Sequence, residues 1–377
     1  VAAHRALLYN FSPYGRPKLM DTPDFWYPHS AAPTIANKAW PYALAPISAL
    51  FGMVSTAKRR FAVSERAGMP VICIGNVTAG GVGKTPVAIE LARMLKEEAE
   101  TPVFLTRGYG GSEPGPLVVS PCDQSPEEVG DEALLLARTA DVIKSGDRVA
   151  GARLAKSVDA SLIIMDDGFQ NHGLYKNFSI LVIDGQAGLG NNRLIPAGPL
   201  REHFSDGLKR AQAVIIMGPG APGDQLAHEA QAHGVPVFRA KIEPDLSSTE
   251  DLIGRRLIAY AGIGRPEKFF ASLTDIGASV LETAAYADHH IYTEREARGL
   301  ITWAEKLKAD LVTTEKDLAR LCCSKEMCQI LAERSLVLPI HVTFDDKPGL
   351  LLLLKDAIAA ARVSHTYIPP GGRHGGA

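Results

Sequence analysis

From residue 70 onward, short apolar runs alternate with segments of helical periodicity. Residues 70–76 have the length and composition of a buried strand, and Val87, Leu91 and Leu95 then recur on one helical face. Further apolar runs of strand length lie within residues 102–110, 160–168, 178–185 and 212–218. Because strands that alternate with helices form mostly parallel sheets covered on both faces, we predict an α/β fold.

A second, smaller α/β lobe is predicted to begin near Arg255. Residues 255–264 have a strand pattern, a helical segment ending at Gly277 follows, and the alternation continues to a helical pattern at 348–363. The predicted parts are an N-terminal extension with a membrane-associated helix, a nucleotide-binding domain, the smaller lobe and a disordered Gly/Pro-rich tail, at residues 1–60, 61–254, 255–364 and 365–377.

The uncharged run at residues 40–57 admits two interpretations. It is short for a membrane-spanning helix, and Pro41 and Pro46 interrupt it. It can be a core helix, or it can lie in the interface of an anionic membrane, with aromatic residues at its start and the basic residues 58–60 after it. The residues alone leave both interpretations open.

The composition is that of a folded protein without an overall charge bias. Of 377 residues, 46% are apolar and 22% are charged, and the formal net charge is −2. The chain can therefore bury a core, and its charge gives no argument for nucleic acid binding. Five cysteines without zinc-ligand spacing, and an N-terminal region without a signal-peptide pattern, predict a reducing cytosolic environment. No protein partner is evident.

The strongest motif is a phosphate-binding loop, TAGGVGKTP, between the first strand and the first helix. Small residues let backbone N–H groups face an anion, and the helix adds the positive end of its dipole. Lys84 would contact the transferring phosphate, and the Thr85 hydroxyl would bind Mg²⁺. Thr78 replaces the first glycine of the strict pattern, and the alternative is an ordinary Gly-rich turn. The predicted nucleotide-binding residues are Thr78, Ala79, Gly80, Gly81, Val82, Gly83, Lys84 and Thr85.

Carboxylates and histidines stand at the ends of other elements. Asp166 and Asp167 follow a buried strand, where P-loop enzymes hold Mg²⁺, although Asp is also common there as a turn residue. Asp131 opens a helix, where the helix dipole by itself favours a carboxylate. His289 and His290 precede another helix and, taken alone, indicate a solvated loop.

Together these segments resemble the tetraacyldisaccharide 4′-kinases of lipid A synthesis. The resemblance covers about residues 40–345 and is carried by GGVGKTP, TRGYGG, VGDEALLLA, DDGFQ, GPLRE, YADHHIYT and TTEKDLARL, in the family's order. It implies a P-loop NTPase-like kinase that transfers the γ-phosphate of ATP, with Mg²⁺, to the 4′-hydroxyl of a tetraacyldisaccharide 1-phosphate. Family members begin much as this chain does at Met20, so residues 1–19 are expected to carry little function.

The resemblance also implies roles for single residues. Asp131, working with His289, would take the proton of the attacking hydroxyl. Asp166 and Asp167 would organise Mg²⁺ and the phosphates, with Thr85 as the second metal ligand. The catalytic residues would be Asp131, His289, Lys84 and Asp167, and the residues lining the cleft would be Tyr109, Arg201 and Glu202. The N-terminal helix would hold the enzyme peripherally on the cytoplasmic face of the inner membrane, where the acylated substrate lies.

The placement of these residues yields a geometric prediction. Ligands of open α/β sheets bind beyond the carboxyl ends of the strands, so the loop, Asp131 and Asp166 should gather there. His289 belongs to the second lobe and can reach Asp131 only if that lobe folds over the cleft. One departure from the family pattern is Asn171, which stands where members often carry His, with His172 next to it.

Three other functions are possible alternatives. The first is a P-loop GTPase or ATPase; a GTPase would normally show a guanine motif, but Lys316 and Asp317 are adjacent and so have the wrong spacing. A soluble small-molecule kinase fits poorly with the apolar run at 40–57. A non-catalytic nucleotide-binding module would leave the carboxylates Asp131, Asp166 and Asp167 at element ends without a purpose.

Overall fold

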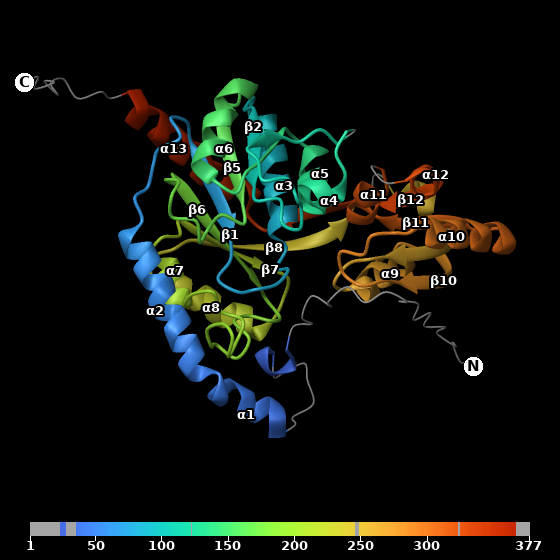
Figure 1. Ribbon diagram of the computed structural model, residues 1–377, viewed down its shortest axis with the longest axis horizontal. Helices are drawn as coiled ribbons and strands as arrows, with labels where there is room; N and C mark the ends of the chain where they lie inside the picture. Colours follow the sequence, from blue (N-terminus) through green and yellow to red (C-terminus); the bar gives the residue numbers. More distant parts are fainter. Residues whose placement is uncertain (1–22, 28–34, 122, 246–248, 323–324, 367–377) are drawn as a thin grey trace, which may run out of the picture.

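The computed structural model describes residues 23–27, 35–121, 123–245, 249–322 and 325–366 and contains two sheets (Figure 1). The first has nine strands in the order β13-β8-β7-β6-β1-β5-β2-β4-β3, and the second has four in the order β10-β9-β11-β12. In the first sheet β3 and β13 pair antiparallel at the two edges, and the strands between them pair parallel. The predicted α/β fold with a mostly parallel sheet and a second lobe is confirmed.

Helices cover both faces of the first sheet. Its strands are β1 (Val71–Gly75), β2 (Pro102–Thr106), β3 (Leu117–Val118), β4 (Val142–Lys144), β5 (Leu162–Asp166), β6 (Phe178–Asp184), β7 (Ala213–Met217), β8 (Val237–Pro244) and β13 (Ile340–Phe344). One face packs against α3 (Lys84–Glu97), α5 (Asp131–Ala137) and α13 (Lys347–Thr366). The other packs against α6 (Arg148–Leu154), α7 (Phe204–Leu208) and α8 (Ala221–Ala232). The short helix α4 (Pro126–Val129) precedes α5.

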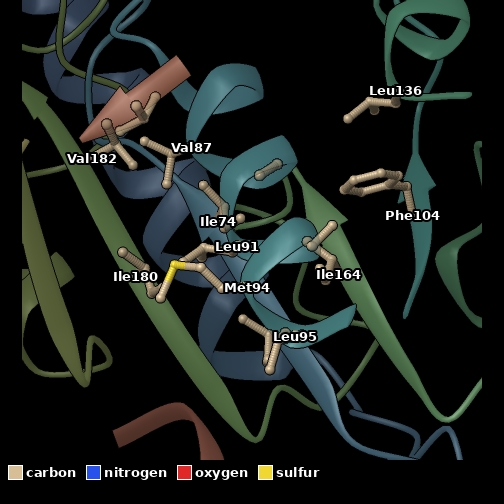
Figure 2. Packing of buried hydrophobic residues seen from close by; sticks show 14 of the residues in the cluster. Ile74, Val87, Leu91, Met94, Leu95, Phe104, Leu136, Ile164, Ile180 and Val182 are labelled. Carbon is tan, nitrogen blue, oxygen red and sulfur yellow. The ribbon is translucent and has the colours of Figure 1, made fainter. Parts of the chain in front are cut away.

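The apolar periodicity of the sequence explains the packing of α3. Val87, Leu91 and Leu95 are fully buried, and they lie over Ile74 of β1 and Ile164 of β5 (Figure 2). Strand β1 is buried along its whole length because parallel neighbours flank it and helices cover both of its faces. The phosphate-binding loop therefore starts from a fully buried strand at the centre of the sheet.

The second lobe repeats the layered plan on a smaller scale. Its strands are β9 (Arg256–Ala261), β10 (Ser279–Ala285), β11 (Asp310–Thr314) and β12 (Ser335–Leu338), all parallel. Helix α9 (Pro266–Asp275) packs on one face, and α10 (Glu294–Leu307), α11 (Glu315–Cys322) and α12 (Glu326–Glu333) pack on the other.

The chain returns to the first sheet at its C-terminal end, which differs from the predicted domain boundary. Strand β13 pairs antiparallel with β8, and Leu350, Leu354 and Ile358 of α13 join the core of the large domain. The predicted lobe of residues 255–364 is therefore wrong from residue 340 onward, because β8 and β12 each have a free edge and sequence periodicity does not say which of them β13 joins. Residues 1–19 and 367–377 lie outside the described residues.

Helices α1 (Ile35–Ala43) and α2 (Ala45–Phe61) run along the outside of the large domain (Figure 1). Of the 17 residues of α2, the buried one is Ser48, whose hydroxyl donates to Leu194 O at 2.9 Å. Large apolar side chains are instead exposed: Ile47, Leu50, Phe51, Met53, Val54 and Phe61. The core-helix interpretation of residues 40–57 is therefore wrong. Among the described residues, no helix has the length and apolar character needed to cross a bilayer.

Candidate active site

The phosphate-binding loop connects β1 to α3 at the carboxyl edge of the large sheet. Gly80 and Gly83 have φ values of 118° and 90°, in the left-handed region that a side chain disfavours. Two backbone hydrogen bonds join the start of the loop to the segment that follows β6. The Ala79 N–H donates to Pro199 O at 2.7 Å, and the Arg201 N–H donates to Val77 O at 2.7 Å. The backbone of the loop is thus shaped before any anion binds.

Lys84, Asp167 and Arg201 form an ion-pair chain beside the loop. Lys84 Nζ lies 3.7 Å from Asp167 Oδ1, and Arg201 Nη1 donates to both Asp167 oxygens at 3.1 and 3.2 Å. Burial by itself would raise the pKa of Asp167, but the charges of Lys84 and Arg201 outweigh burial and hold the pKa below its ordinary value. Asp167 has a φ of 48°, a left-handed conformation that turns its side chain toward these two cations.

Asp166 has the surroundings of a metal ligand. It is fully buried, and its Oδ2 accepts a hydrogen bond from Thr85 Oγ1 at 3.1 Å. Its other oxygen, Oδ1, is buried without a hydrogen-bond partner. Burial, followed by the negative charge of Glu132, raises the pKa of Asp166 to about 7. A buried carboxylate with an unsatisfied oxygen beside a threonine hydroxyl fits Mg²⁺ held jointly with phosphate oxygens.

Asp131 and His289 meet, as predicted, across the two lobes. His289 Nδ1 lies 2.9 Å from Asp131 Oδ2, and the same oxygen accepts from Arg320 Nε and Nη2 at 2.9 and 2.6 Å. Burial by itself would raise the pKa of Asp131. The hydrogen bond from His289 and the charges of Lys316 and Arg320 outweigh burial and hold the pKa well below its ordinary value.

The contact fixes the tautomer of His289. An ionised carboxylate can only accept, so Nδ1 carries the proton toward Asp131 and the lone pair stays on Nε2. Nε2 lies 3.5 Å from Lys316 Nζ, and the His289 side chain as a whole is 36% exposed. His289 has a φ of 59°, which is strained for a residue of this kind and is held by the surrounding contacts.

A second ion pair joins the lobes. Arg265 Nη2, just before α9, lies 2.8 Å from Asp184 Oδ2 at the end of β6. Together with Arg320 on Asp131, this pair holds the described arrangement with the second lobe against the carboxyl edge of the large sheet.

Not every predicted residue reaches the centre. Glu202 is buried and accepts from Gln170 Nε2 at 3.1 Å and from Arg59 Nη1 at 3.2 Å, so it braces the wall behind Arg201. Tyr109 belongs to a loop that packs on Gly130, beside Asp131, but its side chain is 61% exposed. His290 turns into its own lobe, where it stacks on Tyr286 and contacts Glu296.

Sequence reasoning missed Lys316, Arg320 and Glu132 as site residues. Lys316 and Arg320 lie four positions apart on α11 and so share a face, which the sequence could show. Their partner could not be found in this way, because Asp131 lies 189 positions before Arg320. Glu132 follows Asp131 directly, and its effect on Asp166 depends on how α5 packs beside the loop.

Comparison with known proteins agrees with this geometry. A family model described as Tetraacyldisaccharide-1-P 4′-kinase matches residues 40–359. The chain is 46% identical to the tetraacyldisaccharide 4′-kinase of Parvibaculum lavamentivorans, covering 91% of this chain and 99% of that one, and 46% identical to that of Nitrobacter winogradskyi, covering 85% and 94%.

A solved structure of LpxK from Aquifex aeolicus in complex with ATP aligns with a TM-score of 0.65 and 26% identity, covering 84% of this chain and 99% of that one. The match extends over both lobes of the fold described above, and the resemblance read from the sequence motifs is confirmed. The chain belongs to the tetraacyldisaccharide 4′-kinase family.

Proposed function

We infer that this protein is an ATP-dependent kinase that phosphorylates the 4′-hydroxyl of a tetraacyldisaccharide 1-phosphate in lipid A biosynthesis. The observation that supports this function is the group of residues at one edge of the large sheet. There the loop lysine Lys84, the carboxylates Asp166 and Asp167 and the Asp131–His289 pair gather from separate elements. Phosphoryl transfer needs this combination of positioning, charge neutralisation and a proton acceptor. The family membership supplies the acceptor class.

The loop residues Thr78 to Thr85 bind the ATP phosphates through backbone N–H groups and the N-terminus of α3. Lys84 neutralises charge on the transferring group, and Arg201 holds Asp167 in place beside it. Thr85 and Asp166 would hold Mg²⁺, which would supply further charge neutralisation. Arg201, Glu202 and the loop of Tyr109 form walls of the acceptor cleft.

The contacts favour His289 Nε2, with Asp131 orienting the ring, as the group that takes the proton of the 4′-hydroxyl. Asp131 Oδ2 already accepts from His289 and Arg320, and its lowered pKa makes it a weak base. His289 donates to Asp131 through Nδ1, and in the neutral ring the lone pair is on Nε2. This division differs from the role that the family resemblance implied, in which Asp131 was the base.

The exposed apolar side of α2 supports peripheral attachment to the cytoplasmic face of the inner membrane. Leu50 and Met53 are 57% and 63% exposed, and such a surface favours a lipid interface. Of the three basic residues at the end of α2, Arg59 pairs with Glu202, while Lys58 and Arg60 are exposed and can face anionic lipid.

A direct assay tests the function. The purified protein, supplied with Mg²⁺, γ-labelled ATP and the acylated disaccharide 1-phosphate in detergent micelles, should transfer label to the 4′ position. GTP as the better donor, or ATP hydrolysis that the acceptor does not stimulate, would instead point to a P-loop GTPase or ATPase. Transfer to small soluble acceptors at equal efficiency would indicate a soluble small-molecule kinase.

A further inference from the structure

A cationic cavity lies behind the active-site wall, between the end of α2 and the segment that follows β5. It has a volume of about 290 Å³, which is room for a small polar group. The residues of this cationic cavity that matter for its chemistry are Arg59, Phe169, His172, Lys176 and Arg210. Next to it is a groove of about 760 Å³ along α2, and Arg59 lines both.

The charge of the cationic cavity is only partly balanced. Arg59 and Arg210 pair with Glu202, and Arg59 also pairs with Asp206. Lys176 is different: its Nζ donates to the backbone oxygens of Phe169 and Asn171, and among the described residues no carboxylate lies within ion-pair distance of it. Burial lowers the pKa of Lys176, so an anion bound beside this ammonium group would offset the cost of burying its charge.

The neighbouring positive charges also affect the pKa of His172. Burial, followed by the charges of Lys176, Arg210 and Arg59, lowers the pKa of His172 to about 4. The ring is therefore neutral near pH 7 and offers an N–H group to the cavity without adding a charge. Two fixed cations, an ammonium group and a neutral N–H donor form a set suited to a phosphate group.

Hydrogen bonds connect the cationic cavity to the reacting centre. The Glu202 carboxylate accepts hydrogen bonds from Arg59 and Arg210 on the cavity side and from Gln170 Nε2 on the other side. Gln170 Oε1 in turn accepts from Arg201 Nη1 at 3.3 Å, and Arg201 holds Asp167. The cavity is thus braced by the same residues that position the phosphate site.

Building on the proposed function, we propose that the cationic cavity binds the 1-phosphate of the acylated disaccharide, with Lys176 as the residue that recognises it. The acceptor carries this phosphate monoester on the sugar remote from the reacting 4′-hydroxyl. The phosphate would then lie in a cavity that hydrogen bonds through Arg59, Glu202, Gln170 and Arg201 link to Asp167 beside Lys84. The groove along α2, which shares Arg59 with the cavity, leaves acyl chains a path beside the sugar.

The test compares two acceptors, one with the 1-phosphate and one without it, in micelles of a neutral detergent. Wild-type enzyme should show a KM about 10- to 100-fold lower for the 1-phosphate acceptor, the range expected for loss of a charge-assisted interaction. Lys176→Met should raise KM by a similar factor for that acceptor and by less than about threefold for the other, with KM for ATP unchanged. Lys176→Arg should retain most of the discrimination.

The matched control is Lys209→Met, which removes a nearby lysine charge that is 69% exposed and lies outside the cavity. It should leave both KM values unchanged. Equal losses of Lys176→Met on both acceptors, or a wild-type enzyme that does not discriminate between them, would overturn the proposal. So would a Lys176 effect that appears only in vesicles containing anionic phospholipid, which would assign the cavity to a lipid headgroup. Failure of wild type to phosphorylate either acceptor would instead refute the proposed function.

Discussion

Replacing His289 by Gln should lower kcat by about 100- to 10,000-fold, the range that a positioned general base contributes. The change leaves the phosphate-binding loop intact, so KM for ATP should change only a few-fold. Asp131→Asn should lower kcat to a similar extent for a different reason. Its amide oxygen can still accept from Arg320 and His289, which meet on one Asp131 oxygen, but the amide carries no charge. It would therefore no longer stabilise the imidazolium that forms when His289 takes the proton.

The two changes affect the same hydrogen-bonded pair. His289 Nδ1 and Arg320 both contact one Asp131 oxygen, at 2.9 Å and 2.6 Å. The double variant should therefore be little worse than the more damaged single variant. His290→Gln is the matched control, since His290 contacts Glu296 inside its own lobe, and it should keep near-normal kcat.

The pH dependence of kcat separates the two candidate bases. If Asp131 were the base, its lowered pKa would place the acid limb of the profile below about pH 4. An acid limb above that range is therefore not that of Asp131. Strictly additive losses in the double variant, or an acid limb only below pH 4, would refute the assignment of His289.

Three further changes probe other parts of the molecule. Lys84→Ala should nearly abolish turnover while ATP binding weakens less, because the lysine acts mainly on the transferring phosphate; near-normal activity would remove the loop from the mechanism. Arg320→Met removes the guanidinium that pairs with the buried carboxylates of Asp131 and Asp317 and should lower the free energy of unfolding by about 3 to 5 kcal/mol, measured by denaturant titration; a loss under 1 kcal/mol would show that the network relaxes. A variant beginning near residue 62 should move from membranes to the soluble fraction and lose more activity on long-chain than on short-chain acceptors; unchanged partitioning would place the anchor elsewhere.

The large domain could be predicted because its elements are specified locally. The apolar run of β1, the small residues of the loop and the apolar face of α3 are contiguous, and each fits the physical demands of its neighbour. Asp166 and Asp167 were found for the same reason, since a strand end next to a phosphate-binding loop has few other uses for two carboxylates.

The rest depends on contacts between distant segments. Nothing around Arg320 signals that it lies on Asp131, and nothing in residues 340–344 signals that they pair with β8 rather than with the second sheet. The exposure of α2 could not be predicted either, because an uncharged helix has the same composition in a core and at a membrane surface. Periodicity identifies an element and its apolar face but not the partner of that face.

The second lobe is connected to the large domain in a way that makes the proposed base, His289, depend on the position of that lobe. The chain leaves through β8 and returns through β13, which pair side by side from Ile340 opposite Pro244 to Phe344 opposite Ala240. Away from this ribbon, the lobes meet at the ion pairs of Asp131 and Asp184 and where α11 packs against α5, with Ala319 in the core of the large domain. Arg320 also bonds Asp317 and Gly262 O within its own lobe, so it keeps partners if the lobe moves away. His289 would then lose Asp131, and with it the contact that keeps its proton on Nδ1. A proton acceptor assembled only when the lobe is in place limits phosphoryl transfer to the closed arrangement.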